Sequence, residues 1–367
     1  MDVLDPREPR ERVLLALWLE AQRKYALHPE QAPPALRRAR SADELARAFE
    51  RATNASAARL AAQDCEALAR VGACAVPISS ALYPERLRRL VDAPPLLLVR
   101  GAPAFLLVRA VAMVGARAAS AYGLRVAREL AAGAARAGLL VVSGLARGID
   151  AAAHEAALEA GGASLAFLPC GIEQVYPASH RRLAAALAER GAVVSEFPVG
   201  TPPRAPYFPL RNRLISALSE AVLVVEARIA SGTLVTARHA ANQGVDVLAV
   251  PGPVHSPTSA GPHLLLRDGA GLVTCVADLL EAFGLEAKEP ARASAASGAA
   301  LRASDSENTR LAARALALLR SEPLAREALA ARLGAEHAPL AAALLELELA
   351  GEASEDRDGS WVATRPS

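Results

Sequence analysis

The chain has 367 residues, of which 52% are apolar, and its formal net charge is +2. This length and apolar content allow a large core and predict two or three domains. The balanced charge excludes a general basic coat, so a nucleic-acid partner would have to be held by a local cluster of cations. Aromatic residues make up only 4% of the chain, which argues against a surface covered with base-stacking side chains.

The four cysteines are Cys65, Cys74, Cys170 and Cys275. They form no C-x-x-C pair and have no clustered histidines, so neither a zinc site nor a disulfide framework is expected. No apolar run reaches the roughly 18 residues of a membrane span, and the first residues are charged and helical, unlike a signal peptide. We therefore expect a soluble, cytoplasmic protein that has no metal, no cofactor and no membrane partner.

The first part of the chain, residues 1–75, shows the apolar spacing of amphipathic helices, for example at Leu14 and Leu17. This pattern predicts a small helical domain. A connecting segment follows and contains a short strand, Leu96 to Arg100. We expect that strand to pack against the sheet formed by the next segment.

From Ala110 to about Phe283, short apolar segments alternate with helical ones. The expected strands are Ala110–Val114, Leu139–Ser143, Ser164–Leu168, Ala192–Glu196, Ala221–Val225 and Asp246–Val250. The strand at 221–225 is apolar on both faces, which indicates a central parallel strand. The repeated strand–helix units predict an α/β domain over residues 76–284, with a doubly wound, mostly parallel sheet of Rossmann type. Such sheets bind ligands at the carboxyl ends of their strands.

Residues 285–306 are rich in Ala, Ser and charge and lack apolar periodicity, which is typical of a linker. Residues 307–367 then show three short helical patterns and a hairpin around Asp358-Gly359, as in a winged helix. Many helix-turn-helix modules bind DNA. However, residues 305–367 hold seven arginines, no lysines and eleven carboxylates, so we favour protein contact or stability as the role of this acidic module.

Four loops at predicted strand ends carry the candidate ligand-binding residues. The first follows the strand that ends at Val114 and contains Gly115 and Arg117. Gly115 allows a sharp turn of the backbone, and Arg117 can reach an anion held at the start of the next helix. Alone, this loop could equally be a tight turn with a surface arginine, because it does not match G-x-G-x-x-G.

The second loop supplies the candidates Ser143, Gly144, Arg147 and Gly148. Its glycines can let backbone N–H groups line a concavity, and its arginine adds a full positive charge. Asp150 and His154 follow, and together with the serine they could suggest a hydrolase. We do not favour that interpretation. An Asp one helical turn before a His usually caps the helix or neutralises a nearby charge, and no G-x-S-x-G nucleophile elbow is present.

The third loop opens a helix with Arg211, Asn212 and Arg213. Two arginines within one helical turn repel each other unless an anion lies between them or carboxylates neutralise them. The carboxylates that could form such an internal ion-pair network are Glu196, Glu220 and Glu226. We favour a phosphate ligand, and this choice implies that charge reversal at both arginines would abolish binding and leave the fold intact.

The fourth loop opens a helix with Ser231, Gly232 and Thr233. Ser231 is a good N-cap residue, Gly232 removes steric bulk, and the hydroxyls face the start of the helix. Ordinary helix capping would explain this loop equally well if it stood alone. Four such loops on one sheet are far more specific than any single loop, and together they predict a phosphate-binding pocket.

The segment from Tyr83 to Phe283 resembles the DNA-processing protein A family (DprA or Smf) of bacterial natural transformation. The motifs that carry the resemblance are VGAR, SGLARGIDAAAH, CGIEQVYP, SEFPVGTPP, FPLRNRLISALSEAVLVVEA, SGTLVTARHAANQG and VLAVPGPV. The resemblance also covers the C-terminal winged-helix module. It extends faintly to the helical N-terminus, which is a sterile-alpha-motif-like (SAM-like) domain in relatives.

The resemblance implies a non-enzymatic protein that binds incoming single-stranded DNA, protects it and helps to load the RecA recombinase. It also implies a homodimer formed through the Rossmann-like domain. The candidate residues of all four loops would line its phosphate-binding pocket. Two positions depart from the family: Ala116 stands where many relatives have Ser or Thr, and Gly261-Pro262-His263 replaces a usual Gly-Thr-Asn.

Two enzyme classes with related folds are alternatives. The lysine-decarboxylase-like phosphoribohydrolases resemble PGGxGTxxE and use a Glu three residues after the Thr, but Thr236 occupies that position here, so the group for acid–base catalysis is missing. A nicotinamide-dependent dehydrogenase would need G-x-G after the first strand and an acid after the second. The chain has Gly115-Ala116-Arg117 and Ser143-Gly144 at those places.

Overall fold

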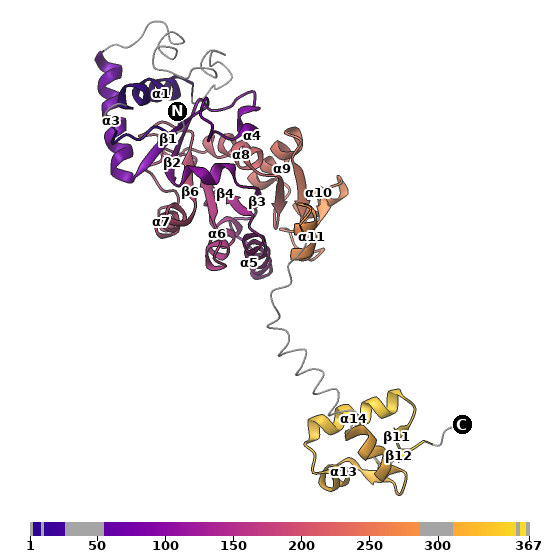
Figure 1. The fold of residues 1–367 in the computed structure, drawn as a ribbon. Helices are drawn as coiled ribbons and strands as arrows, with labels where there is room; N and C mark the ends of the chain where they lie inside the picture. Colours follow the sequence, from indigo (N-terminus) through magenta and orange to yellow (C-terminus); the bar gives the residue numbers. More distant parts are fainter. Residues whose placement is uncertain (1–2, 9–10, 26–54, 286–310, 357–359, 365–367) are drawn as a thin grey trace. The chain divides into compact units, whose positions relative to one another are not determined.

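The structure is a computed structural model that describes residues 3–8, 11–25, 55–285, 311–356 and 360–364. It contains two compact units, Met1–Ala287 and Lys288–Ser367 (Figure 1). Each unit has its own apolar core. The expected linker, 285–306, falls almost wholly outside the described residues.

The first unit is built on a nine-stranded sheet with the order β1-β2-β6-β5-β4-β3-β7-β8-β9. In chain order, the strands are β1 (Ala73–Pro77), β2 (Leu96–Gly101), β3 (Ala110–Val114), β4 (Leu140–Ser143), β5 (Ser164–Phe167), β6 (Ala192–Ser195), β7 (Ala221–Val224), β8 (Asp246–Ala249) and β9 (Gly271–Leu272). The seven strands from β6 to β9 in this order are parallel. The doubly wound α/β sheet is therefore confirmed, and each predicted strand is present with its ends shifted by one residue at most.

The strand order reverses direction between β3 and β7. The chain winds from β3 through β4, β5 and β6 on one side and then returns to β7, β8 and β9 on the other. The loops after β3 and β7 must diverge at this point, so a crevice forms at the carboxyl ends of the two strands. Three of the four candidate loops follow β3, β4 and β7, and the third candidate loop opens the helix that leads into β7.

Helices cover the sheet on both faces. They are α1 (Arg12–Tyr25), α3 (Ala55–Val71), α4 (Glu85–Arg88), α5 (Ala121–Arg136), α6 (Ile149–Glu159), α7 (Arg181–Arg190), α8 (Tyr207–Leu218), α9 (Gly232–Asn242), α10 (Ala260–Arg267) and α11 (Val276–Glu281). Figure 1 shows α5 and α6 on one face and α8 and α9 on the other.

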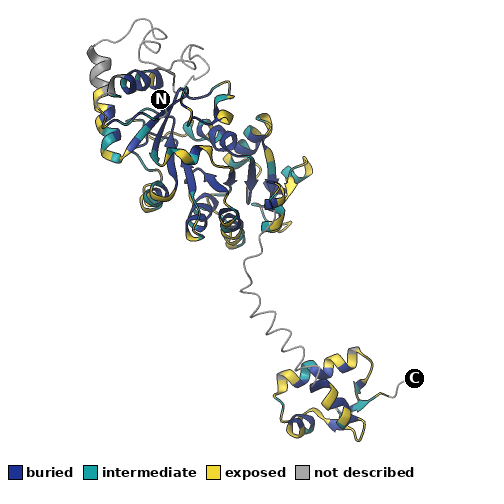
Figure 2. Cartoon of the chain, viewed as in Figure 1, coloured by how far each residue is buried: buried dark blue, intermediate teal, exposed yellow. Residues whose placement is uncertain are grey.

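The central strand β3 shows why the sheet needs both layers of helices. All five of its residues are buried, as the dark blue strands of Figure 2 illustrate. Its side chains alternate: Val111 and Met113 join the core with α5 and α6, whereas Ala112 and Val114 join the core with α8. A strand that is apolar on both faces is stable only when both faces are covered.

Two antiparallel strands extend the sheet beyond the prediction. The predicted strand at 96–100 is β2, and it pairs antiparallel with β6 as part of the sheet. β1 was not predicted as a strand, although its backbone pairs with β2. Helix α1 packs against β2 and α3, so the amino-terminal helices share the core of the sheet. The expected SAM-like domain over 1–75 includes residues 26–54, which lie outside the described part of the chain, and it stays a prediction.

The second unit has the elements of the expected winged helix. Residues 311–319 are helical and are followed by α13 (Arg326–Leu333) and α14 (His337–Leu349). A three-stranded sheet has the order β10 (Leu324–Ala325), β12 (Ser360–Ala363), β11 (Ala353–Glu355). β11 and β12 form the arms of the predicted hairpin, whose centre at 357–359 is not described. Trp361 packs into the core of this unit.

Within the described part of the chain, no helix is long and apolar enough to cross a membrane. The same residues contain no group of three or more His, Cys, Asp or Glu that could hold a metal ion.

Gly101, at the end of β2, provides a test of the pairing between β2 and β6. Its φ is +111°, and a Cβ at this position would lie 2.5 Å from the carbonyl oxygen of Gly191. Gly138 has a φ of +84° and open space around it. We predict that Gly138→Ala lowers the free energy of unfolding, measured in urea, by about 1 kcal/mol, from backbone strain alone. Gly101→Ala should lower it clearly more, because the new Cβ also clashes with the Gly191 carbonyl. Equal losses in the two variants would contradict this explanation of the strand end.

Candidate functional site

A pocket of about 220 Å³ lies at the carboxyl ends of β3 and β7, where the strand order reverses. We call it the switch-point pocket. From the candidate list it is lined by Gly115, Arg117, Arg211, Asn212, Ser231, Gly232 and Thr233. The second loop contributes Ala146 and Asp150, which were not candidate residues, so all four predicted loops meet at this pocket.

A second cavity of about 310 Å³, here the rim cavity, adjoins the first and shares Arg117, Ala146 and Phe208 with it. It adds Gly144 and Arg147 from the loop after β4. The candidates Ser143, Gly148 and Arg213 line neither cavity.

Aromatic rings and cations meet in the rim cavity. The Arg117 guanidinium lies 5.0 Å from the centroid of the Phe208 ring, and the Tyr176 and Phe208 rings form a T-shaped pair with 5.5 Å between centroids. Tyr176 is 42% exposed, and Arg117 and Arg147 are also exposed. The rim thus offers charge for an anion and ring faces for a planar group.

The sequence analysis did not assign a role to Phe208 or Tyr176. The low aromatic content of the chain argued against base-stacking side chains in general. Their positions could have identified these two: Phe208 lies at the start of the helix that carries Arg211, and Tyr176 follows β5, the next strand beyond β4.

A buried carboxylate holds the loop that carries Arg117. Glu226, only 3% exposed, accepts hydrogen bonds from the Ser120 backbone N–H at 2.9 Å and the Ser120 hydroxyl at 2.6 Å. It also accepts one from the Thr258 hydroxyl at 3.0 Å. Ser120 in turn caps α5. The far end of the loop is therefore fixed to the end of β7, which limits where the Arg117 backbone can move.

Close backbone packing fixes the near end of the same loop. A Cβ on Gly115 would lie 2.4 Å from Ile149, and a Cβ on Gly148 would lie 2.2 Å from the carbonyl oxygen of Ala116. Gly148 also has a φ of +79°. The Thr233 hydroxyl donates to the Gly115 carbonyl at 3.1 Å, which ties the start of α9 to this loop. Gly148 thus lets two loops touch, and it lines neither cavity.

The residues that could suggest a hydrolase do not form a catalytic chain. The Ser143 hydroxyl donates to the Met113 carbonyl at 2.6 Å, and Asp150 accepts from the backbone N–H groups of Gly144 at 3.1 Å and Ala146 at 3.4 Å. The His154 ring pairs instead with the Ser164 hydroxyl at 2.7 Å. Burial lowers the pKa of His154 to about 3, so the ring is neutral at ordinary pH. Asp150 serves to shape the loop after β4.

Arg211 braces the floor of the site. It is 3% exposed, and its Nη1 donates to the carbonyl of Gly144 at 2.8 Å and to the carbonyl of Phe167. The Gly144 carbonyl directly follows β4, and the Phe167 carbonyl belongs to the last residue of β5. One guanidinium therefore joins two neighbouring strand ends. Burial lowers the pKa of Arg211 to about 10, partly offset by the charge of Asp150, and the side chain still carries its charge.

Arg213 points away from both cavities and into an ion-pair network. It forms two hydrogen bonds with Glu196, at 2.7 and 3.1 Å, and its Nε donates to Asp92 at 2.6 Å. Arg213 and Glu196 are 3% and 1% exposed. The internal ion-pair network that we weighed against a phosphate ligand is therefore present at Arg213. Because both Arg211 and Arg213 are buried, reversing their charges would disturb the fold, contrary to our expectation from the sequence.

Ser231 does not act as an ordinary cap. It stands at the N-cap position of α9, but its hydroxyl makes no capping hydrogen bond. The Ser231 hydroxyl oxygen is buried and has no hydrogen-bond partner among the described residues. The first N–H groups of α9 and this hydroxyl therefore remain available to a group in the switch-point pocket.

The family models and the curated relatives that match the chain identify one family. Residues 75–284 match the family model of DNA recombination-mediator protein A, and residues 290–359 match that of the DprA winged helix domain. Protein Smf of Escherichia coli strain K12 is 49% identical over 213 residues, which are 57% of each chain. A putative DNA processing protein DprA of Mycobacterium tuberculosis is 49% identical over 48% of this chain and 45% of its own length. The chain thus spans about half the length of these curated relatives.

Two solved structures are similar to this one. DNA processing protein A from Streptococcus pneumoniae aligns with a TM-score of 0.58 and 31% identity, over 77% of this chain and 98% of that one. DNA processing protein A from Helicobacter pylori, described for its single-stranded DNA binding mode, aligns with a TM-score of 0.51 and 28% identity, over 55% of this chain and 92% of that one.

The assignment of Arg213 to the ion-pair network can be tested by stability. We predict that Arg213→Met costs about 3–5 kcal/mol in urea unfolding, because it leaves Glu196 buried and unpaired. Arg128→Met is the matched control: Arg128 pairs with Glu155 on the surface at 44% exposure, and its loss should cost less than about 1 kcal/mol. Similar losses in the two variants would show that Arg213 is not a buried brace.

Proposed function

The chain belongs to the DNA recombination-mediator protein A family, and from this premise we propose that it binds single-stranded DNA without sequence preference. The observation that carries the proposal is a cluster beside the switch-point pocket, in which Arg117, Arg147 and Tyr176 are exposed and Phe208 is half-buried. The relative from Helicobacter pylori, whose description names single-stranded DNA, supports it.

The geometry suits a strand in which phosphates and bases are held by different groups. Arg117 and Arg147 project from the loops after β3 and β4 and can each pair with a phosphate. The Ser231 hydroxyl and the first N–H groups of α9 offer further hydrogen bonds to an anion. Phe208 and Tyr176 offer ring faces on which any base can stack. Neither type of contact depends on base identity, so binding is sequence-tolerant.

The proposed job is binding and not catalysis. Asp150 is the carboxylate among the residues that line the switch-point pocket, and it is 6% exposed and already accepts two backbone N–H groups. The position that would hold the catalytic Glu of a phosphoribohydrolase is Thr236, which is buried. Among the residues that line that pocket, no free carboxylate is therefore positioned for general acid–base catalysis.

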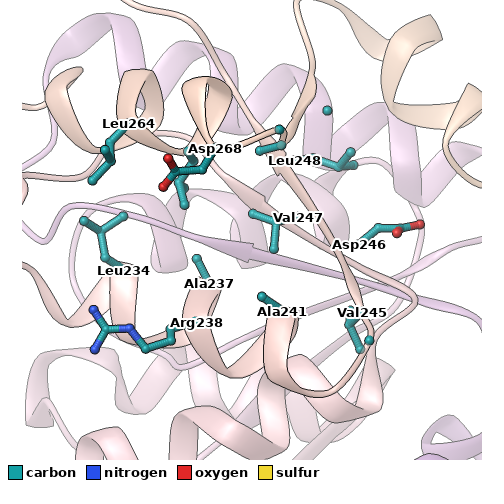
Figure 3. A pocket seen from close by; sticks show the side chains of 15 residues that line it. Leu234, Ala237, Arg238, Ala241, Val245, Asp246, Val247, Leu248, Leu264 and Asp268 are labelled. Atoms are coloured by element: carbon teal, nitrogen blue, oxygen red, sulfur yellow. The ribbon is translucent and has the colours of Figure 1, made fainter.

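We place a homodimer contact at the edge of the sheet formed by β9. A groove of about 700 Å³ lies between α9, β8 and α10, and Figure 3 shows the apolar side chains of Leu234, Val247 and Leu264 around it. Leu264 is 39% exposed, and Leu272 on the edge strand β9 is 56% exposed. An exposed apolar edge of this kind is typical of a protein interface. Two strand-binding sites in one dimer would hold one DNA strand more tightly than either alone.

The physiological role that we propose is the one that the resemblance to the family implies. In it, the protein binds incoming single-stranded DNA in the cytoplasm, protects it and helps to load RecA during natural transformation. The acidic winged-helix module fits protein contact or stability better than phosphate binding, since residues 305–367 contain more carboxylates than arginines.

The rim residues provide the test of strand binding. We predict that Phe208→Ala weakens binding of an oligothymidine by about five- to a hundredfold, because one stacked base contributes about 1–3 kcal/mol. Arg117→Gln should weaken binding and lower the salt dependence by about 0.7 per lost phosphate contact. Fluorescence anisotropy over a salt series measures both effects.

Arg128→Gln is the control for these two variants, because it removes an exposed charge from the outer face of α5. It should leave strand binding unchanged. If Phe208→Ala and Arg117→Gln fold normally and bind as tightly as wild type, the rim cavity is not the DNA site.

Sedimentation tests the dimer contact. We predict that Leu264→Glu combined with Leu272→Glu yields a monomer, because the charges would be buried against a second copy. Leu107→Glu is the control: Leu107 is 54% exposed, lies in the 3-10 helix between β2 and β3, and does not line the groove. A wild-type protein that sediments as a monomer, or a double variant that stays dimeric, would contradict this placement.

A further inference from the structure

The start of α7 carries an unusual pair of cations. Arg181 and Arg182 are the first two residues of this ten-residue helix, both are exposed, and its first turn contains no acidic residue. The N-terminus of a helix has a partial positive charge from its unpaired N–H groups. Two arginines at that end are therefore unfavourable unless an anion offsets them.

Carboxylates of the neighbouring elements do not supply that anion. On α6, which packs against α7, Glu155 and Glu159 pair with Arg128 of α5. Glu173, the acidic residue that precedes α7 in the chain, accepts the backbone N–H of Gly200 at 2.8 Å. Among the described residues, no ion pair is found for Arg181 or Arg182. The positive charge at this helix end is left for solvent or a ligand.

The start of α7 is joined to the rim cavity. Tyr176 and Pro177 line that cavity, and the short 3-10 helix Ala178–His180 leads from Pro177 directly into Arg181. His180 Nδ1 lies 2.9 Å from the carbonyl oxygen of Leu145, two residues before Arg147. In the chain, only the three residues Ala178–His180 thus separate the arginine pair from Pro177 in the wall of the cavity.

We propose that Arg181 and Arg182 form an exit track, a second contact region that holds the phosphates of the same DNA strand as it leaves the rim cavity. This inference rests on the proposed function and extends it. The track adds phosphate contacts alone, because the first turn of α7 has no aromatic side chain. It therefore adds affinity only for a strand long enough to reach past Tyr176, and it sets the length of strand that one subunit covers.

The test compares strand lengths. Binding of oligothymidines of about 4 and about 16 nucleotides is measured by fluorescence anisotropy over a salt series, with wild type and with the double variant Arg181→Gln/Arg182→Gln. We expect the variant to bind the short strand like wild type and the long strand about three- to tenfold more weakly. Its salt slope on the long strand should fall by about 0.7 for each lost phosphate contact.

The matched control is Arg136→Gln/Arg190→Gln. It removes two exposed arginines from the last turns of α5 and α7, at the opposite end of the helices from the track. This control should bind both strands like wild type. If it weakens long-strand binding as much as the track variant does, the effect is one of net charge and the track is overturned.

The outcomes separate this inference from the proposed function. Equal long-strand affinity and salt slope in the track variant and wild type overturn the track and leave the rim site standing. Weaker binding of the short strand by the track variant also overturns it, since the arginines would then belong to the rim site. Failure of wild type to bind either strand overturns the proposed function itself. Circular dichroism confirms that the variants, all at exposed positions, are folded.

Discussion

The candidate site depends on buried guanidinium groups that hold strand ends together. Arg211 joins the carbonyls of Gly144 and Phe167 at the ends of β4 and β5, and Arg213 joins Glu196 after β6 to Asp92 before β2. Where a strand ends, its last carbonyl groups leave the ladder of the sheet and need other hydrogen-bond partners if they are buried. Because arginine offers five donors in a fixed plane, one side chain can satisfy several such oxygens at once. The loops that begin at these strand ends inherit their positions from this bracing.

Burial therefore divides the four pocket-region arginines of the candidate list into two groups. Arg211 and Arg213 are each 3% exposed and are engaged with the protein, whereas Arg117 and Arg147 are exposed and project from the two loops that the bracing positions. The charge that builds the site is therefore separate from the exposed charge that we propose as the ligand contact. This separation allows the contact loops to present arginines beside aromatic rings without unpaired charge in the core.

Much of this organisation could be predicted from the sequence. Strands such as 110–114 and 221–225 are buried on both faces, so their apolar runs were unambiguous, and the loops after them had to meet at the crevice. The sequence could not show that Arg211 lines the pocket while Arg213 forms ion pairs away from it. The partners of Arg213 include Asp92, which lies 121 positions away in the chain. It also missed Phe208 and Tyr176, whose value comes from their contact in space. β1 was missed because its five residues, which end in proline, gave no clear strand pattern.

The most direct test of the account is a structure of this protein bound to a short oligothymidine. We expect phosphates within hydrogen-bond distance of Arg117 and Arg147, a base stacked on Phe208, and Arg213 still paired with Glu196. A strand that lies away from the rim cavity, or an Arg213 that leaves Glu196 to contact a phosphate, would contradict it.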